Sequence, residues 1–235
     1  MIKQAIILAG GLGTRLREVV ADRPKCMALI NGKPFLHYLV KYLKKEGITH
    51  FIFSVGYMHE MIEDYLKSMH PTINYQISLE EESLGTGGGI KLACKLAMDE
   101  NVIVCNGDTM YKVNIAELSV FHKSKHAACT LTLKPMQDFE RYGAVELNND
   151  QSVLTFKEKM FYKEGLINGG VYALNAQRFL AENLPEKFSF EEDYLEKKIY
   201  SLKNNSEIFG CVQDNYFIDI GIPEDYKRAE KEIGI

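Results

Sequence analysis

The chain has 235 residues and a net charge of −4, from 28 basic and 32 acidic residues. This acidic balance disfavours a nucleic-acid surface, which normally carries a basic excess, so we expect no nucleic-acid partner. Hydrophobic residues make up 46% of the chain and charged residues 26%, which is typical of a globular protein with a substantial core.

Short β-rich runs alternate with helical patterns in the first part of the chain. We expect strands at residues 4–9, 50–55, 75–78, 102–105 and 128–133, and helices at residues 35–45, 58–68, 86–98 and 116–124. This alternation predicts an α/β fold: a Rossmann-like, mostly parallel sheet between two layers of helices. Ligands of such sheets bind beyond the carboxyl ends of the strands, where the loops after Ala9 and Cys105 emerge.

The pattern changes after Pro135, where we expect a small antiparallel insertion. Residues 142–147 and 153–156 predict a hairpin, residues 166–174 predict a further strand, and the insertion is expected to form a lip over the sheet edge. The chain then returns through residues 206–212 and 216–218. It finishes with a helix from about Pro223, since proline suits the first position of a helix.

The first strand runs directly into a glycine-rich turn, Gly10-Gly11-Leu12-Gly13-Thr14-Arg15, and Lys25 follows ten residues later. Glycines let a polyanion approach backbone N–H groups, and the two cations can hold a phosphate chain from its flank. Leu16 stands where a dinucleotide fingerprint needs its third glycine, and no P-loop pattern occurs. The alternative is a tight connection without a ligand, but such a turn needs neither cation. The segment therefore predicts a nucleoside triphosphate site.

Two acidic residues follow apolar strands that lie far apart in the sequence. Asp108 ends the run Asn106-Gly107-Asp108, and Asp219 precedes a tight turn at Gly221. A carboxylate at the carboxyl end of a strand suits a hard divalent cation. The alternative is that both are unrelated turn acids, because Asn-Gly-Asp is also favourable turn chemistry.

Residues 8–16 together with Pro24-Lys25 resemble the signature of the sugar-1-phosphate nucleotidyltransferases. Within that family, residues 17–28, 31–36 and 80–91 are similar to the D-glycero-α-D-manno-heptose 1-phosphate guanylyltransferases. Family-like segments recur from Ile6 to Tyr226. The resemblance implies the nucleotide-diphospho-sugar transferase fold in one domain over residues 1–235. Residues 1–134 would mainly bind nucleotide and residues 135–235 mainly sugar phosphate, without the C-terminal β-helix that some relatives carry.

The resemblance also implies the reaction and its residues. The substrates would be GTP and D-glycero-α-D-manno-heptose 1-phosphate, and the products pyrophosphate and GDP-heptose, which serves surface polysaccharides such as capsule. Arg15 and Lys25 would be catalytic, and Asp108 and Asp219 would bind Mg²⁺. The expected nucleotide-binding residues are Leu8, Ala9, Gly10, Gly11, Gly13, Thr14, Glu80, Gly85 and Thr86. The expected sugar-phosphate residues are Asn106, Gly107, Tyr142, Gly143, Glu158, Lys159, Asn168, Gly169 and Gly170.

Two of these assignments have a physical reason in the sequence. Asn168 is followed by two glycines inside a strand, which weakens the strand unless something must approach the backbone, as a flat sugar would. Glu80 is the candidate for reading the base, because one carboxylate can accept both adjacent donors of guanine, whereas uracil and thymine present an oxygen there. A solvated acidic run, Glu80 to Glu82, is the alternative. The Glu158-Lys159 pair also fits an ordinary exposed strand.

Other functions stay open at this point. The same class of enzyme could use mannose 1-phosphate with GTP, or another sugar 1-phosphate with UTP or CTP. A nucleotide-binding regulatory paralogue is a further alternative, although it would be expected to lose a phosphate cation or a metal acid. A dinucleotide oxidoreductase is disfavoured by Leu16. A homodimer is compatible with the sequence.

The cysteines and the first residues of the chain indicate the cellular compartment in which we expect the protein. Five scattered cysteines without paired spacing predict neither a disulfide framework nor a zinc site. No cationic-then-apolar leader precedes the first strand, and no apolar run reaches the length of a membrane span. We therefore expect a cytoplasmic protein without a membrane partner.

Overall fold

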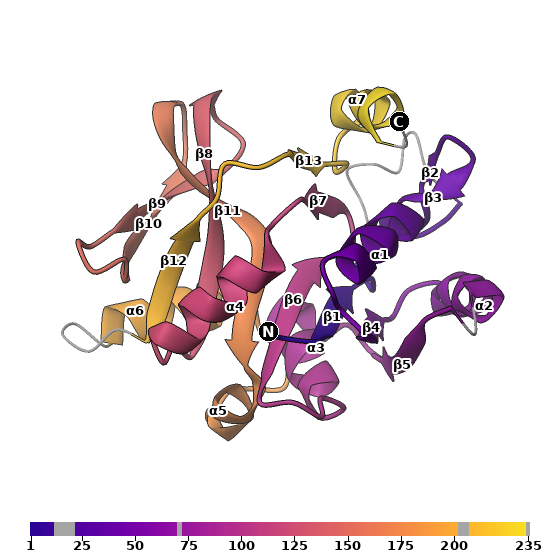
Figure 1. Ribbon diagram of the computed structural model, residues 1–235, viewed down its shortest axis with the longest axis horizontal. Coiled ribbons are helices and arrows are strands. Elements are labelled where there is room, and N and C mark those ends of the chain that lie inside the picture. The colour runs from indigo at the N-terminus through magenta and orange to yellow at the C-terminus, as the bar shows by residue number, and fades with distance from the viewer. Residues whose placement is uncertain (12–21, 70–71, 202–206, 234–235) are drawn as a thin grey trace.

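A nine-stranded sheet forms the centre of the protein in a computed structural model that describes residues 1–11, 22–69, 72–201 and 207–233 (Figure 1). Its strands are β1 (Gln4–Leu8), β4 (His50–Val55), β5 (Asn74–Leu79), β6 (Asn101–Asn106), β8 (Cys129–Phe139), β9 (Gly143–Leu147), β10 (Val153–Lys159), β11 (Tyr162–Asn175) and β12 (Ile208–Val212). The strand order is β10-β9-β11-β6-β1-β4-β5, and β8 pairs with both β11 and β12 beside this path.

The first part of the sheet is a run of parallel strands. Strands β6, β1, β4 and β5 all pair in parallel, and Leu8 lies opposite both Ser54 and Asn106. The carboxyl ends of these strands therefore meet at one edge, as the alternation of strands and helices predicted.

The antiparallel part is built around β11, which pairs with β6, β8 and β9. The predicted hairpin is confirmed as β9 and β10. It extends the main sheet through β11 and does not lie as a lip over the sheet edge. Strand β8 continues through Pro135 because β12 ends opposite Leu133, so the proline removes no hydrogen bond to that side.

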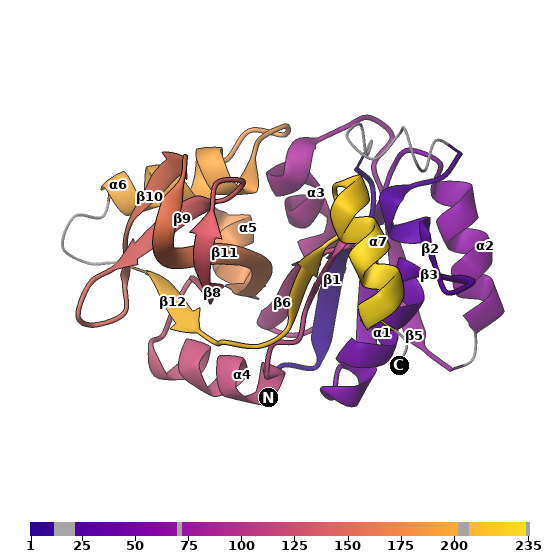
Figure 2. The ribbon, with the colours of Figure 1, turned by 90° about the horizontal axis from the view of Figure 1, so that it is seen from above.

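Alternate residues of each strand enter two separate cores. Ala5 and Ile7 pack on one face with α1 (Phe35–Lys45), α2 (His59–Met69), α4 (Ile115–Ser124) and α7 (Pro223–Glu232). Ile6 packs on the other face with α3 (Gly85–Cys94), α5 (Ala176–Ala181), η3 (Phe190–Glu196) and α6 (Lys197–Ser201). Figure 2 shows α1 and α3 on opposite sides of β1. Each fully buried isoleucine contributes about 1.5–3 kcal/mol, so this two-sided pattern fixes the register of the sheet.

Helix α1 matches its prediction at both ends, and α2 and α4 match theirs to within one residue at each end. Helix α3 ends at Cys94, earlier than residue 98, because the next three N–H groups bond three residues back and the chain tightens. The side chain of Gln4 then accepts from the N–H groups of Met98 and Asp99. Within the described ranges, no helix combines the length and apolar character needed to cross a membrane.

Several short elements were not predicted. They are the 3₁₀ turn η2 (Lys25–Met27), the hairpin β2 (Leu29–Ile30) and β3 (Lys33–Pro34), and the strand β7 (Thr109–Tyr111). Strand β13 (Phe217–Asp219) lies close to the predicted residues 216–218, but its pairing with β7 was not predicted. Asn31 and Gly32 connect β2 to β3 with φ of +50° and +78°, the backbone that an Asn-Gly hairpin turn requires. The Asn31 amide donates to the carbonyls of Glu230 and Ile233, which fastens this hairpin to the end of α7.

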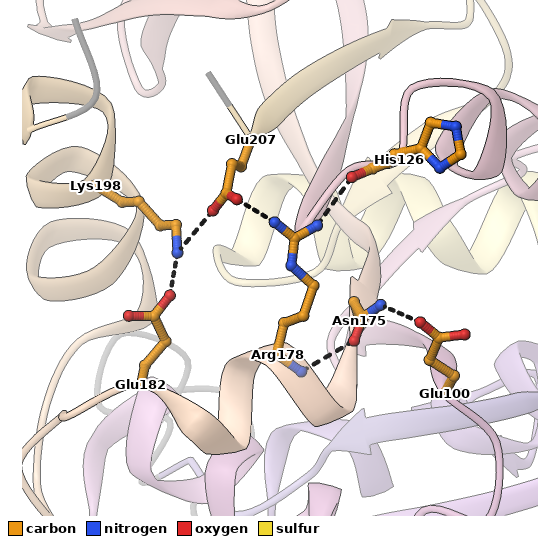
Figure 3. A network of polar contacts seen from close by, with 7 residues as sticks. All are labelled: Glu100, His126, Asn175, Arg178, Glu182, Lys198 and Glu207. Carbon is orange, nitrogen blue, oxygen red and sulfur yellow. Dashed lines mark hydrogen bonds and ion pairs between the residues drawn. The ribbon is translucent and has the colours of Figure 1, made fainter. Parts of the chain in front are cut away.

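A polar network holds the opposite end of the sheet together, at the amino end of β6 (Figure 3). Arg178 of α5 pairs with Glu207 and donates to the His126 carbonyl at 2.9 Å. Lys198 of α6 pairs with Glu182 and lies 3.1 Å from Glu207. The network therefore connects α5, α6 and the start of β12 away from the carboxyl ends of the parallel strands.

Candidate active site

Three neighbouring cavities follow the carboxyl ends of the parallel strands. The Glu80 cavity, of about 600 Å³, is lined by residues that include Gly10, Gly11, Tyr57 and Glu80. The central cavity, of about 240 Å³, is lined by Leu8, Ala9, Gly11, Lys25, Cys26, Thr86, Asn106, Gly107 and Asp108. The Asn168 cavity, of about 370 Å³, is lined by residues that include Asn106, Tyr142, Lys159, Asn168, Gly169, Gly170 and Asp219. Gly11 lines both the Glu80 cavity and the central cavity, and Asn106 lines both the central cavity and the Asn168 cavity, so the three cavities are neighbours in a row.

A partly buried ion pair lies in the central cavity. Lys25 Nζ is 3.2 Å from Asp108 Oδ2, and the two side chains are 17% and 28% exposed. The turn η2 sets the lysine at this position, while Asp108 follows the end of β6. The first half of the predicted site is thus assembled from segments 83 residues apart.

The short ladder between β7 and β13 brings the second acid beside the first. Asp219 pairs with Thr109, and the N–H of Ile220 donates to the Asp108 carbonyl at 3.0 Å. Burial raises the pKa of Asp219, and the neighbouring Asp108 carboxylate raises it further, while Lys25 lowers it. The two predicted acids are therefore close enough to interact electrostatically, although one lines the central cavity and the other the Asn168 cavity.

This pair of acids fits Mg²⁺. Magnesium usually takes one or two protein carboxylates and completes its shell with water and substrate phosphates. In the described part of the chain, no cluster of three or more His, Cys, Asp or Glu side chains could hold a metal by itself. Two carboxylates with a repulsive interaction and open cavity beside them suit a hard cation that arrives with phosphate.

Glycine is required for different physical reasons at different positions along this edge of the sheet. A Cβ on Gly107 would lie 2.6 Å from the Leu8 carbonyl, so β6 needs glycine to approach β1 there. A Cβ on Gly10 would lie 3.0 Å from the N of Gly56. Among the residues that the structure describes, a Cβ on Gly11 would meet nothing within 4 Å. Packing against these residues therefore gives no reason for glycine at position 11, where a ligand could use the space. The predicted residues Gly13, Thr14 and Arg15 lie outside the described residues.

Glu80 is held by two hydrogen bonds in the wall of its cavity. Ser54 Oγ donates to Oε1 at 3.0 Å, and the Leu84 N–H donates to Oε2 at 3.1 Å. The carboxylate is half-buried and lies against Gly10 and Gly89. Because each carboxylate oxygen has a second lone pair, both oxygens can still accept from a ligand.

The predicted residues Gly85 and Thr86 take different places at the start of α3. Thr86 lines the central cavity, and its Oγ1 accepts from the Phe190 N–H at 2.9 Å. Gly85 has a φ of +72°, and a Cβ on it would lie 2.6 Å from the Phe188 carbonyl. This glycine is thus required by backbone geometry and packing, and it lines none of the three cavities.

A break in the strand ladder opens the Asn168 cavity. The pairing of β11 with β8 shifts register between Asn168 and Tyr172. Gly170 has a φ of +70°, and a Cβ on Gly169 would lie 2.3 Å from the Tyr111 ring. The two glycines thus allow the irregular backbone and the close approach of Tyr111, which leaves the Asn168 side chain at the cavity wall.

The remaining sugar-site candidates divide into two groups. Tyr142 and Lys159 line the Asn168 cavity. Gly143 pairs with Lys159 in the sheet but is not part of the lining. Glu158 is exposed and also outside the lining, and its carbonyl accepts from the Tyr162 hydroxyl at 3.0 Å. The structure therefore brings Lys159, but not Glu158, to the cavity.

Sequence reasoning missed two charged residues of this cavity, Glu191 and Arg141. Glu191 of η3 accepts from Asn168 Nδ2 at 2.9 Å and from the Tyr172 hydroxyl at 3.0 Å. Nothing in the acidic first turn of η3 indicates a sugar site in the sequence, because only the fold brings Glu191 to β11. Arg141 directly precedes Tyr142, a predicted sugar-phosphate residue, and this position in the sequence could have indicated that Arg141 belongs to the site.

The cysteines are structural. All five are free and buried. Cys26 lines the central cavity, but burial, with a further contribution from Asp108, raises the pKa of its thiol to about 12. It stays protonated at neutral pH and is a poor nucleophile.

Comparison with known proteins matches residues 4–234 to the family described as nucleotidyl transferase. The chain is 51% identical over 230 residues to the D-glycero-alpha-D-manno-heptose 1-phosphate guanylyltransferase of Aneurinibacillus thermoaerophilus, with 98% of each chain covered. It is 47% identical to the protein of the same name from Campylobacter jejuni, over 95% of this chain and 96% of that one. The crystal structure of HddC from Yersinia pseudotuberculosis complexed with GMP-PN has a TM-score of 0.86 at 36% identity, covering 99% of this chain and 100% of that chain.

Proposed function

Because this chain belongs to the nucleotidyl transferase family, we propose that it joins GTP to D-glycero-α-D-manno-heptose 1-phosphate, giving GDP-heptose and pyrophosphate. The family resemblance and the fold class expected from the sequence are confirmed. Relatives at 51% and 47% identity carry this activity in their names, and a structural neighbour was solved with a guanine nucleotide analogue. The observation that carries the proposal is the row of three neighbouring cavities with Lys25 and Asp108 in the middle one.

The row of cavities supports a linear arrangement of the reactants. Guanine would occupy the Glu80 cavity, the reacting phosphates the central cavity, and the sugar the Asn168 cavity. A phosphate oxygen of the sugar 1-phosphate then attacks the α-phosphorus of GTP in line, and pyrophosphate leaves on the opposite side. The attacking phosphate is already ionised at neutral pH, so the site needs no general base. Catalysis depends on positioning and on stabilising the charge that develops.

Lys25 would stabilise that charge. Its ammonium is paired with Asp108 and its side chain is only 17% exposed, so solvent would weaken its attraction for the reacting phosphate only a little. Asp108 and Asp219 would hold Mg²⁺, which supplies Lewis-acid stabilisation of the phosphate oxygens when bound. Arg15 remains the predicted contact of the β and γ phosphates.

Glu80 would select guanine. The N1–H and N2–H₂ donors of guanine match the two carboxylate oxygens, each of which has one acceptor position left beside its protein partner. Asn168 and Glu191 would bind sugar hydroxyls, and Lys159 the sugar phosphate.

Pyrophosphate release from a matrix of substrates tests the proposal. GTP, ATP, UTP and CTP are each combined with the 1-phosphates of D-glycero-α-D-manno-heptose, mannose and glucose, in the presence of Mg²⁺. We expect the highest kcat/KM for GTP with the heptose 1-phosphate. A preference for mannose 1-phosphate would keep the reaction but replace the sugar. Tight GTP binding with no turnover on any sugar phosphate would contradict the proposal and favour a regulatory protein.

A further inference from the structure

Arg141 forms part of the wall of the Asn168 cavity, in the turn between β8 and β9. One guanidinium nitrogen, Nη2, makes both of its protein hydrogen bonds, to the Asp225 carboxylate and to the Tyr142 hydroxyl. The guanidinium also lies 5.4 Å from the centre of the Tyr142 ring. Among the described residues, none accepts a hydrogen bond from Nε or Nη1. Arg141 therefore has donors to spare in a cavity wall.

Asp225 of α7 fixes the guanidinium in this position. Its side chain is 8% exposed, against 42% for Arg141, and it also lies 3.1 Å from Arg228 on the same helix. Burial lowers the pKa of Arg141, but the bond to Asp225 and the nearby charges of Asp225 and Asp219 more than compensate. Asp219 lines the same cavity as Arg141, and the N–H of the next residue, Ile220, donates to the carbonyl of Asp108, which lines the central cavity.

We propose that Arg141 binds the phosphate of the sugar 1-phosphate, and that Asp225 is the positioning residue that orients its guanidinium. The inference rests on the proposed function. The attacking phosphate must lie where the Asn168 cavity meets the central cavity. Asp219 lines the Asn168 cavity together with Arg141, and the pairing of β13 with β7 brings Asp219 beside Asp108 of the central cavity. Lys159 lines the same cavity, but a lysine offers a single point charge. The free N–H groups of Arg141 can bind two phosphate oxygens at once and so fix the direction of attack.

Arg141→Gln tests the assignment, with Arg228→Gln as the matched control. Both changes remove one arginine from Asp225, but Arg228 does not line the Asn168 cavity. Steady-state kinetics should show KM for the sugar 1-phosphate raised about 10- to 100-fold by Arg141→Gln, the loss expected for a charge-assisted pair. KM for GTP should change less than about twofold by the same reasoning, because the base and triphosphate contacts are untouched. The control should leave both constants near those of the unmodified enzyme.

Two further variants keep the test decisive if Arg141→Gln does not fold. Arg141→Lys should raise KM for the sugar 1-phosphate severalfold, because it keeps the charge but loses the two-point contact. Asp225→Asn should raise the same constant by a smaller factor than Arg141→Gln, since the guanidinium remains but is less well oriented. An unchanged KM for the sugar 1-phosphate in the arginine variants would overturn the inference, and so would an equal rise in KM for GTP.

The unmodified enzyme separates this inference from the proposed function. If it releases no pyrophosphate with any sugar 1-phosphate, the proposed function fails and the inference fails with it. If it turns over normally while Arg141→Gln behaves as the control does, only the inference fails.

Discussion

Replacing Glu80 by glutamine tests base selection without changing the shape of the side chain. In the unmodified protein the carboxylate accepts from Ser54 Oγ at 3.0 Å and from the Leu84 N–H at 3.1 Å. The glutamine oxygen can keep the Leu84 bond, and its NH₂ can donate to the Ser54 hydroxyl, which is able to reverse its role. The variant should therefore fold, with a melting temperature close to that of the unmodified protein.

Glu80→Gln should instead weaken the binding of guanine. Glutamine would present a donor to the N1–H and N2–H₂ edge, so one charge-assisted hydrogen bond is lost and a donor faces a donor. Hydrogen bonds to charged groups contribute about 1.5–3 kcal/mol, which corresponds to a roughly 10- to 150-fold loss in kcat/KM for GTP.

Inosine triphosphate makes the assay specific, because it lacks the exocyclic amine of guanine. We expect the unmodified enzyme to prefer GTP to ITP by about tenfold or more, the value of one such hydrogen bond, and Glu80→Gln to reduce that ratio towards one. Glu81→Gln is the matched control, since Glu81 lines the same cavity but is exposed. A GTP/ITP ratio in Glu80→Gln equal to that of the unmodified enzyme would show that another residue reads the base.

Three further predictions concern charge in the site and in the core. Lys25→Ala should lower kcat about 10²- to 10³-fold, the usual cost of removing one stabilising donor, and a rapid-quench kcat within twofold of normal would remove Lys25 from the mechanism. Burial and Asp108 raise the pKa of Asp219 above 3.8, so ionised Asp219 costs stability as pH rises through that window. Asp219→Asn should therefore melt higher than the unmodified protein at pH 7 without Mg²⁺ while losing Mg²⁺-dependent turnover, and a lower melting temperature would contradict this reasoning. Burial lowers the pKa of His122 from 6.5 to about 4, so its contribution is complete above pH 6.5 and is lost as pH falls towards 4. Urea unfolding should show a loss of about 2 kcal/mol from this group between pH 7 and pH 5, which His122→Gln should abolish, whereas the same pH dependence in both proteins would contradict the assignment.

The framework of the fold could be predicted because it follows local patterns. The alternation of Ile6 and Ile7 between two cores is a consequence of the two-residue strand period. The apolar spacing of α1 gave both of its ends, and Pro223 marked the start of α7. These features depend on a few neighbouring residues, so the sequence alone is sufficient for them.

The missed features depend on contacts between distant segments. Strand β7 has only three residues, too few to show a period, and its pairing with β13 brings Asp108 and Asp219 together. Glu191 reaches the Asn168 cavity only because η3 packs across β11. The Asn31-Gly32 turn, in contrast, was a readable hairpin signal.

The glycines show the same division between local and distant causes. Gly10 and Gly11 line the Glu80 cavity, at the turn where the sequence predicts a ligand. Gly85 and Gly87 instead pack against Phe188, which is about a hundred residues further along the chain. A glycine-rich run can therefore indicate close packing as easily as phosphate, and only the fold distinguishes the two.

A crystal structure with GDP-heptose bound would test most directly whether the three cavities form one active site. We predict guanine against Glu80, the diphosphate beside Lys25 and Asp108, and the sugar against Asn168, with Arg141 on the phosphate next to the sugar. Guanine bound outside the Glu80 cavity, or a diphosphate that avoids the central cavity, would contradict the account.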